Sequence, residues 1–196
     1  MMVQSVDDVV ARAIEARGGM DRIKTERTQR ITGKISLASD SGQLVVEFKR
    51  PGKMREMVTL NGEPHVRTTE GNVPEMAGSA DFEGPLVDYK AKGNKIELAG
   101  QEEVGDRMAY KLVISMKNGE NRVDFVDAKS YLELKWEGKV GDNVFESYFS
   151  DYRKVDGLMF AFTIDSGLKG QPSNQKIMLE KVEVNPPIDD ARFQKP

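Results

Sequence analysis

From residue 28 onward, apolar and polar residues alternate with a period of two, and turn-forming residues interrupt the alternation at short intervals. In the first such stretch, Ile31 and Ile35 fall on one face, and Thr32 and Lys34 fall on the other. Successive side chains of a β-strand point to opposite faces, so this pattern predicts half-buried strands. The expected strands are 28–37, 44–49, 54–60, 64–70, 95–104, 109–116, 122–127, 131–138, 144–153, 159–166 and 175–184.

Helical signals lie outside these stretches. Ser5 followed by Asp8 approximates a capping box at the start of a helix. The residues that follow have one apolar face, and Gly18-Gly19 predicts the end of the helix. A second short helix is expected at 20–24, a short helix or irregular lid at 81–92, and a final helical turn at 188–193. The apolar positions of the first helix are Val6, Val9, Val10, Ala13 and Ile14.

About eleven strands are too many for a small flat sheet, which must therefore coil. Three architectures satisfy this requirement: a closed barrel, a sandwich, or a half-open barrel plugged by helices. The one-sided helices would fill a concave surface, which favours the third. The sequence predicts a mainly β (α+β) fold, an unclosed antiparallel β-barrel of about eleven strands with helices plugging the concave face. We expect one domain over residues 1–196.

The composition argues against several classes of function. Lys and Arg total 29 and Asp and Glu total 32, for a net charge of -3, whereas nucleic acid binding needs a concentrated basic face. There is no cysteine, which removes disulfides and thiolate chemistry. The single histidine, His65, has no Gly-x-Ser-x-Gly elbow beside it and cannot alone form a typical transition-metal site. We therefore expect no enzyme, no metal site and no cofactor.

The beginning of the chain bears on export. Met1-Met2-Val3-Gln4-Ser5 lacks the basic region and the apolar stretch of a signal peptide. No segment approaches the roughly 20 apolar residues of a membrane-spanning helix. The doubled methionine is typical of an expression start placed before a mature domain, so we expect that an export signal has been removed.

Several motifs resemble one known family. Phe48-Lys49-Arg50-Pro51, followed by Lys53-Met54-Arg55, is similar to a strand–turn signature of the bacterial outer-membrane lipoprotein-sorting proteins. The stretch from Ser150 to Phe160, which contains Asp-Tyr-Arg and Val-Asp-Gly-Leu, resembles another of their motifs. The opening helices and the segment from Asp81 to Lys90 also resemble theirs, so the resemblance covers nearly the whole chain. The segment from Gly71 to Ala80 departs from the family pattern by being short.

The resemblance implies an unclosed β-barrel whose helices form a lid over a hydrophobic cavity. It implies a periplasmic binding or carrier protein for the acyl chains of a lipoprotein, or for another lipid, without catalysis. Arg50 matches the family position implicated in holding the lid to the barrel, and a guanidinium offers five donors for helix-end carbonyls. The candidate cavity residues are Leu44, Val46, Phe48, Leu112, Ile114, Phe125, Leu134, Trp136, Phe160 and Phe162.

A second hypothesis stays open at this point. Relatives with this fold also act as periplasmic sensors or protein-interaction modules in envelope stress signalling, so a membrane-associated protein partner is an alternative to a lipid. The alternation of the strands does not separate the two hypotheses, because a one-residue error in register moves every side chain to the other face.

Overall fold

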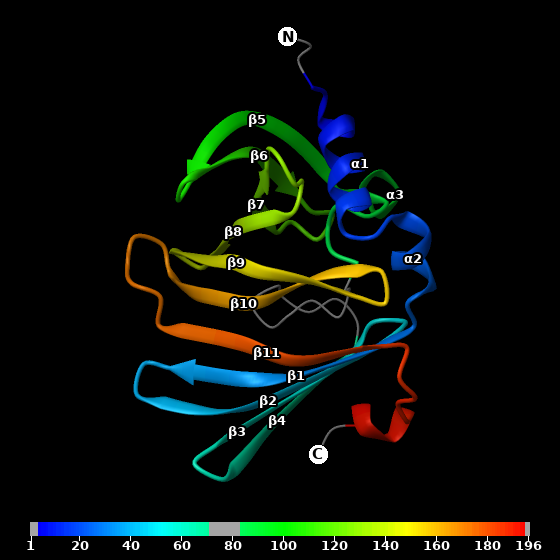
Figure 1. The fold of residues 1–196 in the computed structure, drawn as a ribbon, viewed down its shortest axis with the longest axis vertical. Helices are drawn as coiled ribbons and strands as arrows, with labels where there is room; N and C mark the ends of the chain where they lie inside the picture. Colours follow the sequence, from blue (N-terminus) through cyan, green and yellow to red (C-terminus); the bar gives the residue numbers. More distant parts are fainter. Residues whose placement is uncertain (1–3, 71–82, 195–196) are drawn as a thin grey trace.

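The computed structural model describes residues 4–70 and 83–194 of the chain. In these residues, eleven strands form a single sheet in the order β4-β3-β2-β1-β11-β10-β9-β8-β7-β6-β5, and all neighbouring strands are antiparallel. β4 and β5 lie at the two ends of this order, so the sheet is not closed (Figure 1). The strands are β1 (Thr28–Leu37), β2 (Asp40–Lys49), β3 (Lys53–Leu60), β4 (Glu63–Glu70), β5 (Lys95–Val104), β6 (Arg107–Ser115), β7 (Asn121–Asp127), β8 (Glu133–Val140), β9 (Asn143–Val155), β10 (Leu158–Leu168) and β11 (Gln175–Val184). The predicted unclosed antiparallel barrel of eleven strands is confirmed.

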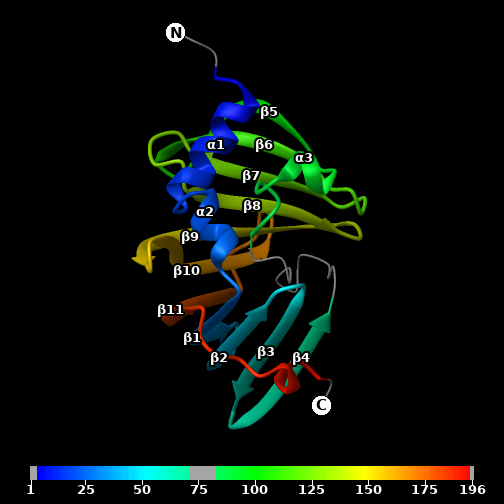
Figure 2. The ribbon, with the colours of Figure 1, turned by 90° about the vertical axis from the view of Figure 1, so that its right-hand side faces the viewer.

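Helical segments of the described residues accompany the sheet: α1 (Val6–Ala16), α2 (Met20–Thr25), α3 (Tyr89–Lys92) and a 3-10 turn, η2 (Asp190–Phe193). α1 begins at a complete capping box, in which the Ser5 hydroxyl accepts from the Asp8 amide and the Asp8 carboxylate accepts from the Ser5 amide. Figure 2 shows α1, α2 and α3 on the same face of the β5–β9 half of the sheet. The expected helix or lid at 81–92 is helical only over Tyr89–Lys92 among its described positions, and 71–82 lie outside the described residues.

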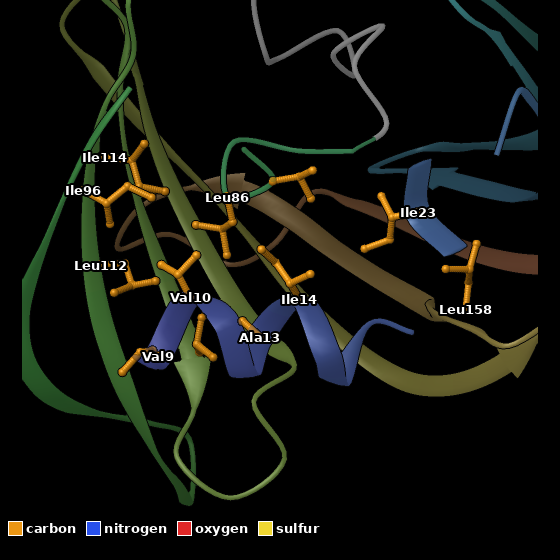
Figure 3. Close-up of a cluster of buried hydrophobic side chains, with 12 residues drawn as sticks. Val9, Val10, Ala13, Ile14, Ile23, Leu86, Ile96, Leu112, Ile114 and Leu158 are labelled. Atoms are coloured by element: carbon orange, nitrogen blue, oxygen red, sulfur yellow. The ribbon is translucent and has the colours of Figure 1, made fainter. Parts of the chain in front are cut away.

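We call the face that carries α1 and α2 the inner face. The apolar stripe of α1 packs there against alternate residues of β5, β6 and β7, in a cluster that also includes Ile23, Leu86 and Leu158 (Figure 3). Val9, Leu112 and Ile114 have no exposed surface. Burial of such side chains contributes about 1.5–3 kcal/mol each, so this cluster holds the helices on the sheet. Its buried members are Val9, Val10, Ala13, Ile14, Ile23, Leu86, Val87, Ile96, Leu112, Ile114, Val126 and Leu158.

The opposite, outer face carries the C-terminal segment on the β1–β3 half. Arg192 Nε donates to Glu47 Oε2 at 2.8 Å, and Arg30 Nε donates to Glu47 Oε1 at 2.9 Å. Glu47 has no exposed surface. Burial opposes its ionisation, but the hydrogen bonds from Arg192 and Arg30 outweigh burial and hold the pKa of Glu47 below its ordinary value. Lys49 Nζ also donates to the Ile188 carbonyl at 2.9 Å, so charged groups fasten the end of the chain to the sheet.

The two halves of the sheet meet where β1 pairs with β11, and the register shifts there between Thr32 and Gly33. A Cβ atom on Gly33 would lie 2.4 Å from the Met178 carbonyl oxygen. Only glycine allows the two backbones to approach so closely, and a bulge at this point increases the local twist of the sheet.

Candidate functional site

A row of apolar side chains crosses the inner face at the centre of the sheet. Ile35 of β1 pairs with Ile177 of β11, Ile177 pairs with Ile164 of β10, and Ile164 pairs with Phe149 of β9. Directly paired residues of antiparallel strands share a face, so these four side chains lie on one face of the sheet. It is the inner face, because Ile35 lies on the same side of β1 as Gln29, and Gln29 lines a cavity together with Ile23 of α2. Ile177, Ile164 and Phe149 are half-buried and lie outside the cluster that packs on α1. We call these four residues the apolar row.

The β2 residues predicted for the cavity extend this inner-face surface. Phe48 pairs with Gln29 and Val46 pairs with Ile31, so both side chains share the inner face with Leu44, which pairs with Gly33. Phe48 packs against Met54, which is fully buried. The structure therefore brings Leu44, Val46 and Phe48 together on one side of the apolar row.

Other predicted cavity residues also lie on the inner face, and three of them pack in the cluster that includes α1. Leu112 and Ile114 of β6 are buried in the cluster with α1, and Phe160 of β10 packs against that cluster. Trp136 of β8 is half-buried and pairs with Asp124, which pairs in turn with Leu112. Leu112, Ile114 and Phe160 therefore belong to the packing around α1.

Phe125 and Leu134 lie on the outer face, unlike the expectation from sequence. Phe125 pairs with Lys111, so it faces away from Leu112, and it packs with Ala109 and Leu134 in a separate cluster. The ladder between β7 and β8 shifts at Phe125/Val126, and this bulge turns Leu134 to the same side as Lys135. The ammonium groups of Lys111 and Lys135 lie 5.7 and 5.3 Å from the centre of the Phe125 ring and cover it.

Phe162 of β10 is 5% exposed, and the guanidinium of Arg153 lies 4.4 Å from the centre of its ring. Arg153 is itself exposed. The structure therefore places Phe162 beneath a surface arginine and on the same face of β10 as Ile164, because no register shift interrupts the pairing of β10 with β9.

Arg50 lies in the turn between β2 and β3 and reaches the end of α2. Its Nε donates to the Glu26 carbonyl at 2.6 Å, and its Nη2 donates to the Ile23 carbonyl at 2.9 Å. Its Nη1 lies 2.6 Å from Glu83 Oε1 in the segment before α3. Carbonyls in the last turn of a helix lack intrahelical partners, and a planar guanidinium can satisfy several acceptors at once. Arg50 thus joins the strand β2, the helix α2 and the chain around Glu83.

Beside Arg50 lies a cavity of about 140 Å³ between the α1–α2 region, β1 and β10. Its polar lining comes from Arg17, Glu26 and Gln29, and its apolar lining from Ile23, Leu158, Met159 and Phe160. Gln29 Nε2 donates to Glu26 Oε1 at 2.9 Å. Burial raises the pKa of Glu26 to about 7, although the Gln29 hydrogen bond and the nearby arginines oppose the shift. Of the cavity residues predicted from the sequence, Phe160 lines this cavity, whereas Glu26 and Gln29 were missed, and their only signal in the sequence is their place at or just before the start of a predicted strand.

A second buried polar group lies on the inner face near Trp136. Arg122 donates to Asp124 and also to Glu133 Oε1, at 2.6 Å for the latter, and its guanidinium lies 5.3 Å from the centre of the Trp136 ring. Burial and the neighbouring Asp124 raise the pKa of Glu133 to about 7. Tyr152 Oη donates to the Glu133 carbonyl at 2.7 Å. These contacts fix β7, β8 and β9 relative to one another beneath α1.

Metal-binding clusters and membrane-spanning helices are both absent from residues 4–70 and 83–194. In these described residues, no three His, Cys, Asp or Glu side chains are grouped so that they could hold a metal ion. His65 lies exposed on β4. None of the helices in this described part of the chain has the length and apolarity that crossing a membrane requires.

No family model and no curated protein matches the sequence, but solved structures share the fold. A LolA superfamily protein from Nitrosomonas europaea aligns with a TM-score of 0.66 and 12% identity, over 98% of this chain and 99% of that chain. A DUF1329 family protein from Desulfovibrio piger aligns with a TM-score of 0.59 and 18% identity, over 98% of both chains. A domain described as an outer membrane lipoprotein-sorting protein, from Vibrio parahaemolyticus, aligns with a TM-score of 0.58 and 10% identity, over 95% of this chain and 94% of that chain. The family resemblance seen in the sequence is thus confirmed at the level of the fold.

Proposed function

We propose that this chain, which has the LolA-type fold, is a periplasmic binding or carrier protein for lipoprotein acyl chains or another hydrophobic ligand, and that it performs no catalysis. The observation that carries the proposal is the apolar row on the inner face. Large apolar side chains of four adjacent strands lie there beyond the cluster that α1 fills; those of β11, β10 and β9 are half-buried, and Ile35 of β1 is buried. Support also comes from the fold shared with a lipoprotein-sorting domain.

The size of the row suits an acyl chain. Neighbouring strands lie about 4.8 Å apart, so four strands place apolar side chains over about 14 Å. Each methylene transferred from water to such a surface contributes about 0.8 kcal/mol. A dozen methylenes would contribute about 10 kcal/mol before the costs of association and ordering are subtracted.

Arg50 is the candidate for coupling ligand entry to movement of the helices. It joins β2 to the end of α2 and to Glu83, so displacement of α2 from the inner face must break these contacts. A ligand that binds only the displaced arrangement would shift the population toward it. In this proposal Arg50 acts as a latch between lid and barrel.

The test compares two neighbouring residues of β11 that lie on opposite faces. Ile177→Glu places a charge in the apolar row, whereas Met178→Glu places the same charge on the outer face, where Met178 is 42% exposed. Both proteins are titrated with the neutral fluorescent probe N-phenyl-1-naphthylamine, and protein purified from cells is analysed by native mass spectrometry. We expect Ile177→Glu to weaken probe binding about tenfold or more, since burying a charge next to an acyl chain is costly. Met178→Glu should bind like the unmodified protein.

Two results would overturn the proposal. One is a protein that carries no lipid from cells and does not bind the probe, which would favour the alternative of a protein-interaction module. The other is an equal loss of binding in both variants, which would place the probe away from the inner face.

A further inference from the structure

The cavity beside Glu26 combines apolar walls with buried polar groups. Ile23 and Leu158, which lie next to each other in Figure 3, supply apolar surface, and Arg17, Glu26 and Gln29 supply the polar lining. Its volume of about 140 Å³ is close to that of an engineered apolar cavity, about 150 Å³, that admits benzene. A cavity of this size holds a small polar group together with a few carbon atoms.

Two of the three polar residues that line the cavity are deeply buried, and Arg17 is half-buried. Glu26 is 3% exposed and Gln29 is 4% exposed. The charged groups that face Glu26 are Arg17, at the end of α1, and Arg50, in the turn between β2 and β3, with Glu83 held by Arg50. Burial raises the pKa of the Glu26 carboxyl to about 7, so at mildly acid pH this group carries a proton and can donate a hydrogen bond.

The cavity adjoins the apolar inner face along β1. Gln29 pairs with Phe48 and with Val184, and Phe48 belongs to the cluster that includes Ile31 and Val46. Gln29 and Ile35 lie on the same face of β1, and the six residue steps between them cover about 20 Å. This length is similar to the 15 Å or so that the acyl chains of one bilayer leaflet span. On this face of β1, Ile31 and Gly33 lie between Gln29 and Ile35, so apolar residues connect the cavity with the apolar row.

We propose that the cavity is the subsite for the carboxylate of a free fatty acid whose chain lies along β1 toward the apolar row. Arg17 supplies positive charge, and Gln29 and protonated Glu26 supply hydrogen-bond donors to the carboxylate. A phospholipid head, with its phosphate, glycerol and second chain, exceeds the volume of this cavity. This assignment rests on the proposed function, because it assumes that the inner face binds an acyl chain.

The experiment compares dodecanoic acid with 1-dodecanol, which differs only in its head group. Each ligand displaces N-phenyl-1-naphthylamine from the whole protein at pH 6 and at pH 8. We expect the acid to bind about tenfold more tightly than the alcohol at pH 6. The preference should fall about tenfold by pH 8, because Glu26 with a pKa of about 7 then ionises and repels the ligand carboxylate.

Two variants test the assignment to Glu26. Glu26→Gln keeps a donor but cannot ionise, so it should retain the preference for the acid and lose its pH dependence. Glu180→Gln removes an exposed carboxylate of β11 and should behave like the unmodified protein.

The outcomes separate this inference from the proposed function. If acid and alcohol bind equally at pH 6, or if Glu26→Gln keeps the pH dependence, the head-group assignment is overturned while the binding function stands. If neither ligand displaces the probe, the proposed function fails and the inference fails with it.

Discussion

Replacing Arg50 with leucine should loosen α2 from the barrel. The guanidinium donates to the carbonyls of Ile23 and Glu26 and pairs with Glu83, whose side chain is only 11% exposed. Leucine preserves part of the apolar stem but none of these interactions. Breaking a buried ion pair costs about 3–5 kcal/mol, but Lys92 Nζ, 3.3 Å from Glu83 Oε2, still neutralises the carboxylate. We therefore expect α2 to lose about 2–4 kcal/mol of local stability.

Amide hydrogen exchange measures this local loss directly. At about 1.4 kcal/mol per factor of ten, the α2 amides should exchange about 30 to 1000 times faster in Arg50→Leu. A suitable reporter is the Ile23 amide, which donates to the Gly19 carbonyl at 3.2 Å. Amides of β6 and β7, remote from Arg50, should change little and serve as the internal reference.

Arg50→Lys is the matched control, because it keeps the charge but cannot hold three acceptors in a planar fork. It should show an intermediate increase in exchange. If α2 exchanges at the native rate in Arg50→Leu, then Arg50 does not hold the helix, and the latch must be abandoned.

Two further predictions concern stability. Glu26 has a raised pKa, so between pH 4.5 and about 7 the unfolded chain releases a proton that the folded protein retains, and stability falls as pH rises through this window. In urea denaturation, Glu26→Gln should therefore have the same free energy of unfolding as the unmodified protein near pH 4.5. At pH 8 its free energy of unfolding should be higher by about 1–3 kcal/mol. Equal stability of the two proteins at pH 8 would contradict the burial of a charged Glu26. Glu47→Ala should lower the free energy of unfolding by about 2–4 kcal/mol, because Arg30 and Arg192 lose the carboxylate that they bind. Glu47→Gln should have an intermediate effect. An unchanged urea midpoint for Glu47→Ala would show that this network adds no stability.

Local pattern was sufficient for the elements of the fold. The alternation around Ile31 and Ile35 predicts β1, and the residues Ser5 and Asp8 predict the start of α1, because strand periodicity and helix capping depend on neighbours within a few positions. The number of strands then predicts a coiled sheet, since a sheet of this size cannot stay flat, and the one-sided helices favour the open form.

The candidate site required the tertiary structure at two points. Alternation does not say which face of a strand is inner, and the structure places Phe125 on the face opposite to Leu112. A bulge also changes the face within a strand, and the bulge between β7 and β8 brings Leu134 to the outer face. Arg50 is marked in the sequence by its motif, but its acceptors at Ile23 and Glu26 follow from how α2 docks.

The sequence by itself determined the eleven strands, the leading helices and the type of sheet that they form, because these depend on local periodicity and on strand number. Only the tertiary structure decided which apolar residues remain half-buried on the inner face and which pack against α1. It also decided that Glu26 and Leu158, 132 positions apart, line one cavity. Such juxtapositions depend on the register and docking of distant segments, and no local pattern encodes them.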